Sequence, residues 1–198
     1  MRPLSDAALV LRCLEGDTDA FGDLVERYEA SVYATAHYYV GRYGAAEDVA
    51  QEAFWAAYRG LRRLKDPNKL GPWLREITTR TAANWLRKNR GRLNHETPLP
   101  HRRTLTMEEA RKGPDALLAR EDLYAKVQRA IDTLPERYRL PVMLRYLQEL
   151  SYEEISQFTG ESRDEIRGIL HRAARQLREV LSEEYEKEQG GSWPHVRK

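Results

Sequence analysis

Five basic side chains recur near the C-terminal end of the chain at spacings of three and four residues. They are Arg163, Arg167, His171, Arg175 and Arg178. An α-helix turns by about 100° per residue, so all five share one arc, opposite the apolar residues of the same stretch. Cations beside a helix N-terminus attract phosphate oxygens while their side chains reach base edges. The spacing therefore predicts a contact with DNA. A solvated arginine face is the alternative, which Asp164 and Glu165 favour.

Two capping boxes precede and begin this basic helix. Ser151 and Glu154 have the spacing of a capping box, and Ser162 and Glu165 repeat it eleven residues later. Gly160, between the two, can adopt the positive φ that ends a helix. The pattern predicts a short helix, a tight glycine turn and a longer helix, which is helix-turn-helix geometry.

A second basic stretch ends the first half of the chain, where no acidic residue occurs from Ile77 to His95. Its cations are Arg80, Arg87, Lys88, Arg90 and Arg92. Trp73, Asn84 and Trp85 lie in or near this stretch, and aromatic rings flanked by cations can stack on unpaired bases. For Trp73, packing in the core is the simpler interpretation.

An acidic and polar patch is predicted on an earlier helix. Asp48, Gln51 and Glu52 have spacings of three and four residues, which place them on one face. Such a patch suits arginine side chains on a partner helix. A solvated face is the alternative.

Composition excludes several classes of protein. The 198 residues are 41% hydrophobic and 32% charged, and no run approaches the roughly 18 apolar residues that a membrane helix needs. The formal net charge is only +2, so any nucleic-acid signal is local. A single cysteine, Cys13, excludes an internal disulfide, and no metal-ligand spacing, phosphate loop or nucleophile motif occurs. We expect a cytoplasmic protein that is not an enzyme, uses no metal or cofactor and does not insert into membranes.

Apolar residues recur at helical spacing throughout, so we expect an all-α protein of two small helical domains joined by a flexible linker. Helices are predicted at 5–16, from about 21 to 41, and at 47–64, 72–90, 115–133 and 135–147, followed by the helix-turn-helix pair. In the helix at 47–64, periodicity predicts that Val49, Phe54 and Tyr58 are buried. Prolines and glycines punctuate a polar stretch between the two halves. The predicted parts are a first domain at 1–94, a linker at 95–114, a second domain at 115–185 and a disordered tail at 186–198.

These motifs, in this order, resemble the extracytoplasmic-function (ECF) group of sigma-70-type sigma factors, the small initiation subunits of bacterial RNA polymerase. In the first domain the resemblance rests on residues 19–21 (DAF), 46–54 (AEDVAQEAF) and 72–74 (PWL), which look like region 2. In the second domain it rests on residues 134–139 (LPERYR), 150–155 (LSYEEI) and 170–173 (LHRA), which look like region 4. The resemblance covers most of the chain.

The resemblance implies partners for each domain. The first domain would bind the clamp helices of the largest polymerase subunit and open the minus 10 promoter element. The second would contact the flap of the second subunit and read the minus 35 element. An anti-sigma factor is also implied.

The resemblance and the patterns above select three sets of site residues. The polymerase-binding residues would be Glu47, Asp48, Gln51 and Glu52. The minus 10 residues would be Asp66, Asn68, Lys69, Arg80, Asn84, Arg87 and Lys88, the first three in a loop that captures a flipped-out base. The minus 35 residues would be Ser162, Arg163, Arg167, His171, Arg172, Arg175 and Arg178.

Two positions depart from the family pattern. Ala45 stands where an acidic residue is usual, and Ile169 stands where a basic residue is usual. We expect the first to weaken the polymerase contact and the second to replace a phosphate contact with apolar surface. The main alternative function is a stand-alone helix-turn-helix regulator that binds an operator as a dimer. A protein interaction module is a third alternative, and in such a protein the arginine arc would have no role in binding.

Overall fold

The structure is a computed structural model, and it describes residues 4–41, 44–93 and 126–189. All regular structure in these ranges is helical, which confirms the predicted all-α class. The predicted linker at 95–114 and most of the predicted tail lie outside the described residues. In the described ranges, no helix is both long enough and apolar enough to cross a bilayer.

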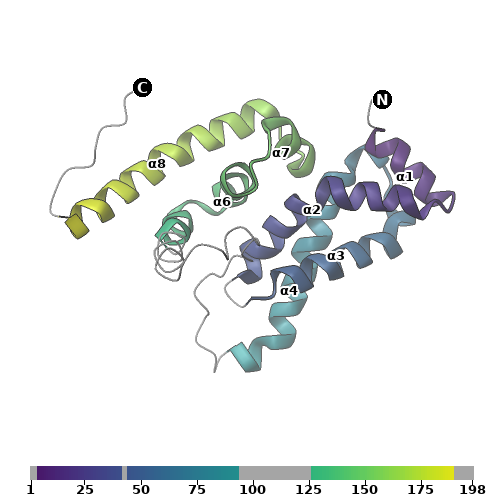
Figure 1. Ribbon diagram of the computed structural model, residues 1–198, viewed down its shortest axis with the longest axis horizontal. Helices are drawn as coiled ribbons and strands as arrows, with labels where there is room; N and C mark the ends of the chain where they lie inside the picture. Colours follow the sequence, from purple (N-terminus) through teal and green to yellow (C-terminus); the bar gives the residue numbers. More distant parts are fainter. Residues whose placement is uncertain (1–3, 42–43, 94–125, 190–198) are drawn as a thin grey trace, which may run out of the picture.

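The described part of the first domain is built from α-helices and short 3₁₀ turns. Its elements are α1 (Asp6–Leu14), α2 (Thr18–Val40), α3 (Ala46–Gly60), η2 (Leu61–Arg63), η3 (Pro67–Lys69) and α4 (Leu70–Leu93). Helices α2, α3 and α4 pack against one another, and α1 packs on α2 (Figure 1). Their apolar faces form the core around Leu24, Val32, Val49 and Leu74.

Side-chain caps fix where these helices begin. The Asp17 carboxylate accepts hydrogen bonds from the amides of Asp19 (3.0 Å) and Ala20 (3.1 Å) at the start of α2. Hydrogen bonding from the Ala20 amide and then from Arg12 lowers the pKa of Asp17, so the cap stays ionised. Helix α1 begins at Ser5 in the same way, with the Ala8 amide donating to the serine hydroxyl at 3.3 Å.

The second domain contains the predicted helix-turn-helix. Residues 126–133 are helical, and then follow α6 (Glu136–Val142), the π-helical turn η4 (Met143–Leu147), α7 (Tyr152–Thr159) and α8 (Arg163–Gln189). The single helix predicted at 135–147 is therefore two segments. The change follows Pro141, which has no amide to donate, and the Gln148 amide donates to the carbonyl of Met143, five residues earlier, at 3.2 Å, as in a π-helix.

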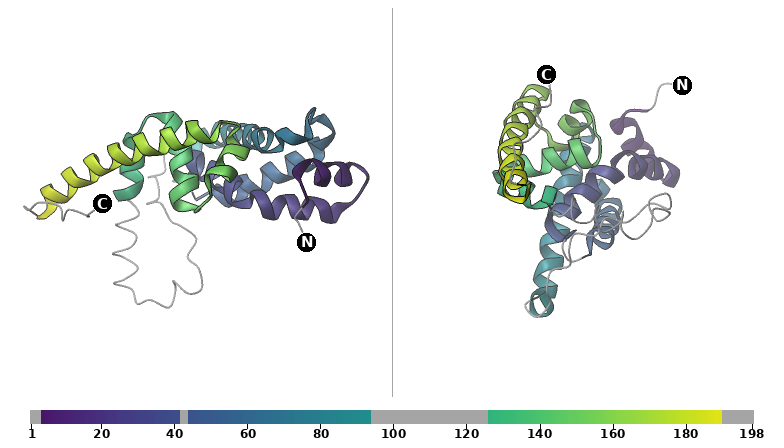
Figure 2. Two further views of the ribbon diagram at one scale, coloured as in Figure 1. Left: turned by 90° about the horizontal axis from the view of Figure 1, so that it is seen from above. Right: turned by 60° about the vertical axis from the view of Figure 1, so that its left-hand side comes forward.

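The two domains pack against each other. Helix α7 lies against α4, and α6 with η4 lies against α2, so the buried apolar residues form one continuous cluster. Figure 2 shows the second domain seated along the first, while the C-terminal half of α8 extends away from the other helices.

Candidate nucleic-acid interface and partner surface

The turn between α7 and α8 has the expected capping chemistry. The Ser151 amide donates to the Glu154 carboxylate at 2.7 Å, and the Glu154 amide donates to the Ser151 hydroxyl at 3.2 Å. The Ser162 and Glu165 pair repeats this arrangement at 2.8 and 3.3 Å. Gly160 has φ of 80°, the left-handed conformation that glycine adopts without strain. The predicted helix-turn-helix is therefore present.

The basic arc of α8 faces outward. Ser162 and all of the predicted cations are exposed, while Ile166, Ile169, Leu170 and Ala173 are buried on the opposite side. Two arginines form surface ion pairs, Arg163 with Glu153 at 3.4 Å and Arg167 with Asp164. Exposed pairs of this kind contribute little free energy, so a phosphate can displace the carboxylate.

Arg172 differs from the other cations of this set, because it contacts the first part of its own domain. Its Nε donates to the Tyr138 hydroxyl at 3.1 Å, and Arg137 donates to the same hydroxyl at 3.1 Å. Hydrogen bonds from these two guanidinium groups lower the pKa of Tyr138, and the bond from Arg137 has the larger effect. Arg172 thus joins α8 to α6 as well as lying near the predicted DNA face.

The loop before α4 is ordered by Asp66. Its carboxylate accepts hydrogen bonds from the backbone amide (3.0 Å) and the side-chain amide (3.1 Å) of Asn68. Asp66 is thereby the N-cap of η3. Asn68 and Lys69 are exposed, whereas Asp66 is half-buried. Asp66 is thus the cap of this loop, and the exposed Asn68 and Lys69 are accessible to a ligand.

The basic stretch of α4 is divided between exposed and packed residues. Arg80, Arg87 and Lys88 are exposed, and Arg80 is paired with Glu76 at 2.6 Å. Asn84 is half-buried. Trp73 packs against the core beside Gly60, as expected for a structural tryptophan.

Helix α3 presents the predicted acidic patch. Glu47, Asp48, Gln51 and Glu52 are all exposed. The patch continues into an aromatic surface that is not among the predicted site residues, with Trp55 63% exposed. Its signal was available, because Trp55 lies three and four residues after Glu52 and Gln51 on the same helical face.

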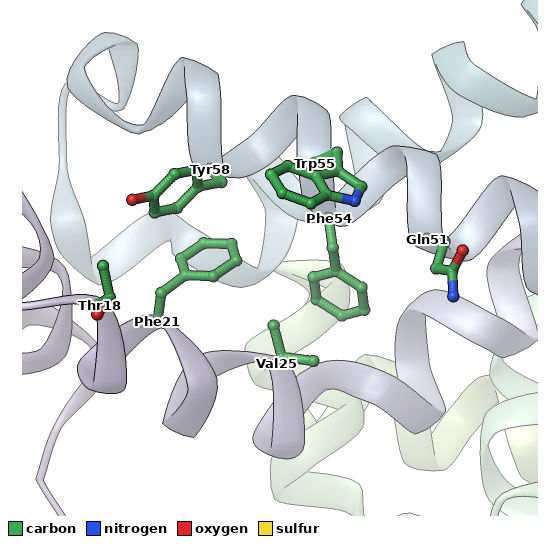
Figure 3. A pocket seen from close by; sticks show the side chains of 7 residues that line it. All are labelled: Thr18, Phe21, Val25, Gln51, Phe54, Trp55 and Tyr58. Carbon is green, nitrogen blue, oxygen red and sulfur yellow. The ribbon is translucent and has the colours of Figure 1, made fainter.

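The aromatic surface borders a groove between α2 and α3 (Figure 3). Its lining residues are Thr18, Phe21, Val25, Gln51, Phe54, Trp55 and Tyr58. Tyr58 packs edge-on against Phe21, with ring centroids 4.9 Å apart, and against Trp55 at 6.4 Å. The prediction that Tyr58 is buried is wrong, because the residue is 42% exposed. Exposed aromatic rings are typical of a protein-binding surface.

The two departures from the family pattern are both buried. Ala45 is 4% exposed and is the N-cap residue of α3, where it makes no side-chain hydrogen bond. An acidic side chain at this position would cap α3, so the alanine removes a helix cap rather than a charge of the exposed patch. Ile169 is 6% exposed and packs in the core, so the expectation that it adds apolar surface to the DNA face is wrong.

Comparisons with known proteins agree with this arrangement. Residues 24–92 match the model of sigma-70 region 2, and residues 124–177 match that of sigma-70 region 4. The chain is 30% identical over 171 residues to the ECF RNA polymerase sigma factor SigW of Bacillus subtilis, covering 84% of this chain and 91% of SigW. The chain belongs to the ECF group of sigma-70 family sigma factors.

Further matches agree with this ECF assignment. The ECF RNA polymerase sigma-E factor of Escherichia coli K12 is 37% identical over 161 residues, covering 77% of this chain and 82% of that protein. The fold matches that of CnrH, solved in complex with the cytosolic domain of CnrY, with a TM-score of 0.57 and 22% identity over 89% of this chain and 96% of that chain. This sigma factor directs promoter-specific transcription initiation by RNA polymerase, and its family is not one of enzymes.

Proposed function

We propose that three separate surfaces of this sigma factor bind three different targets. The exposed face of α3 binds the clamp helices of the core polymerase, the loop before α4 together with the basic side of α4 binds the minus 10 element, and α8 reads the minus 35 element. The observation that carries the proposal is the unbroken exposed face of α3, which runs from Asp48 through Glu52 to Trp55.

The α3 face has the chemistry of a polymerase contact. Asp48 and Glu52 offer carboxylates to arginines of a partner, and bidentate pairs of this type fix orientation. Trp55 offers a large apolar area beside them, and tryptophan is enriched among the residues that carry most of the energy of protein interfaces. Charge and aromatic anchor lie on one helix, so a partner helix can engage both.

The minus 10 assignment follows from the loop and from α4. Asn68 and Lys69 project from a loop that Asp66 already holds in shape, so little ordering is needed when a base enters. Extruding a base costs a few kcal/mol, which contacts with these loop residues must return. Arg87 and Lys88 then supply charge for the strand backbone.

The minus 35 assignment follows from the first turns of α8. Arg163 and Arg167 are 67% and 70% exposed and belong to a helix of 27 residues, long enough to lie in a major groove. We further propose that the second domain contacts the flap of the second polymerase subunit, as the family resemblance implies.

The decisive experiment combines core binding with transcription. Asp48→Arg reverses a charge on the α3 face, and Glu15→Arg reverses an exposed charge elsewhere in the same domain. We expect Asp48→Arg to lose co-purification with core polymerase and promoter-specific run-off transcription, with unchanged circular dichroism, while Glu15→Arg retains both. Normal co-purification of Asp48→Arg would refute the patch assignment. Binding of paired operator half-sites without core polymerase would instead support the stand-alone regulator.

We also propose a protein regulator. The resemblance implies an anti-sigma factor, and CnrH, whose fold is similar, was solved in complex with the cytosolic domain of CnrY. An anti-sigma factor of this chain would compete with core polymerase for the α3 face. This is tested by purifying the wild-type sigma factor and the Asp48→Arg variant from the native cell. We expect the variant to lose both the bound regulator and the polymerase.

A further inference from the structure

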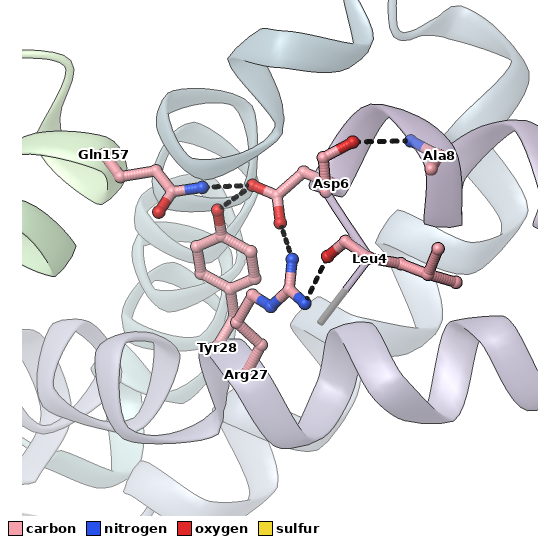
Figure 4. Close-up of polar contacts among 7 residues, drawn as sticks. Leu4, Asp6, Ala8, Arg27, Tyr28 and Gln157 are labelled. Atoms are coloured by element: carbon pink, nitrogen blue, oxygen red, sulfur yellow. Dashed lines mark hydrogen bonds and ion pairs between the residues drawn. The ribbon is translucent and has the colours of Figure 1, made fainter. Parts of the chain in front are cut away.

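A buried carboxylate joins the two domains. Asp6 at the start of α1 is 5% exposed, and its oxygens accept hydrogen bonds from Arg27 at 2.5 Å and from the hydroxyl of Tyr28. The side-chain amide of Gln157, on α7 of the second domain, donates to the same carboxylate at 2.6 Å (Figure 4). One polar network therefore spans 151 residues of sequence.

The backbones of the two domains also touch. Gly71 is the second residue of α4, and a methyl group there would overlap the carbonyl oxygen of Gln157 and lie 2.8 Å from Cα of Phe158. Gly160 approaches Pro72 in the same way, because a methyl group at Gly160 would lie 3.0 Å from Cγ of Pro72. Gly71 is helical, so no unusual φ requires glycine at this position. The close approach of α7 is what requires it.

This contact places the two proposed DNA-binding surfaces beside each other. Lys69 is three residues from Pro72, and Arg163 is three residues from Gly160. A chain extends by at most about 3.6 Å per residue, so the Cα atoms of Lys69 and Arg163 are no more than about 30 Å apart. By their numbering, the minus 35 and minus 10 positions are about 25 base pairs apart, which is about 85 Å of duplex at about 3.4 Å per base pair.

We infer that the contact of α7 with the first turn of α4 and with Asp6 of α1 is an autoinhibitory latch, which must open before one molecule can read both promoter elements. The latch residues are Asp6, Gly71, Gln157 and Gly160. Its consequence for promoters rests on the proposed function, whereas the latch itself does not. Opening leaves no buried charge without a partner, because Asp6 keeps Arg27 and Tyr28.

Gly71→Ala tests the latch in the full-length protein. The added methyl group suits a helix in an open molecule and clashes only across the domain contact. Gly91→Ala is the matched control, because it lies on the same helix with nothing within 4 Å of the added methyl group. By small-angle X-ray scattering we expect the radius of gyration of Gly71→Ala to exceed that of wild type and Gly91→Ala by about a half, as for two domains that separate by roughly 20 Å. Equal radii for Gly71→Ala and wild type would overturn the latch.

A second pair of variants keeps the test independent of one substitution. Gln157→Glu places a carboxylate against Asp6, and like charges at hydrogen-bond distance repel, so we expect the same expansion. Gln157→Lys restores a donor of opposite charge, so we expect it to remain compact. Expansion of both variants, or of neither, would contradict the role of the Asp6 contact.

Transcription separates the latch from the proposed function. At limiting sigma factor, an opened Gly71→Ala should initiate from a cognate promoter several-fold more than Gly91→Ala, because it spends no free energy on opening. Expansion in scattering without any gain in initiation would overturn the autoinhibitory role. Failure of the wild-type protein to bind core polymerase would instead overturn the proposed function and leave the scattering result intact.

Discussion

The guanidinium group of Arg172 lies over the backbone of Gly168, one helical turn earlier on α8. A methyl group at Gly168 would lie 3.3 Å from a terminal nitrogen of Arg172, closer than ordinary van der Waals contact. The arginine reaches the Tyr138 hydroxyl from this position, which joins α8 to α6. The glycine within the recognition helix is thus explained by an internal contact, and close approach of the DNA backbone is not needed to account for it.

This relationship predicts a coupling between the two positions. Gly168→Ala should gain up to about 1 kcal/mol of helix propensity, but in the wild-type background it must displace the Arg172 guanidinium. We expect Gly168→Ala to stabilise an Arg172→Ala protein more than it stabilises wild type, by about 0.5 kcal/mol. Urea unfolding of the four proteins of the cycle measures this difference. Equal gains in the two backgrounds would show that the two residues do not interact.

A second prediction concerns the exposed arginine Arg167. Arg167→Ala should weaken promoter binding by the holoenzyme about tenfold, within the range expected for loss of one arginine contact to DNA, and leave core binding intact. Arg129→Ala removes an exposed arginine from another helix of the same domain and should have no such effect. Footprinting across a salt series measures both the affinity and its salt slope. A wild-type affinity and slope for Arg167→Ala would remove this residue from the DNA interface.

Trp55 is the residue at which the structure adds most to the sequence. Trp55→Ala should weaken core binding by at least tenfold, because an exposed ring can contribute about 2 kcal/mol or more at the centre of an interface. The change leaves the fold intact, since the ring is exposed. Tyr146→Ala, an exposed aromatic in the other domain, is the matched control. Competition with a labelled sigma factor for core polymerase measures the loss, and equal competition by the two variants would contradict the role of Trp55.

The sequence was sufficient for features that depend on local chemistry. The capping boxes at Ser151 and Ser162 and the glycine turn at Gly160 are present as predicted, because caps and turns are set by a few neighbouring residues. The outward arc of α8 was equally accessible, because helical periodicity fixes which residues share a face.

Features that depend on packing between distant elements were not predictable. Periodicity assigned Tyr58 to the core, but no described element covers that side of the groove between α2 and α3. The π-helical turn after Pro141 depends on which carbonyl a later amide finds. Nothing local to Gly71 or Asp6 indicates the domain contact, because their partners lie on α7, far along the chain.

The last prediction concerns acid and the first capping box. Hydrogen bonds from the Ser151 hydroxyl and amide lower the pKa of Glu154 below its usual value. Because the folded-state pKa is the lower one, the carboxylate stabilises the fold fully above the unfolded pKa, and this contribution is lost as pH falls through the folded value. Glu154→Gln keeps an acceptor but no charge, so it should cost a few tenths of a kcal/mol at pH 7, given the exposure of the side chain.

The difference between wild type and Glu154→Gln should therefore disappear when the pH falls below the depressed pKa of Glu154. Glu179→Gln, which neutralises an exposed carboxylate on α8, serves as the control for the loss of one charge from the domain. Urea unfolding of the three proteins at neutral and acidic pH measures the change in free energy. A difference between wild type and Glu154→Gln that persists unchanged in acid would show that the ionised form of Glu154 does not hold the cap.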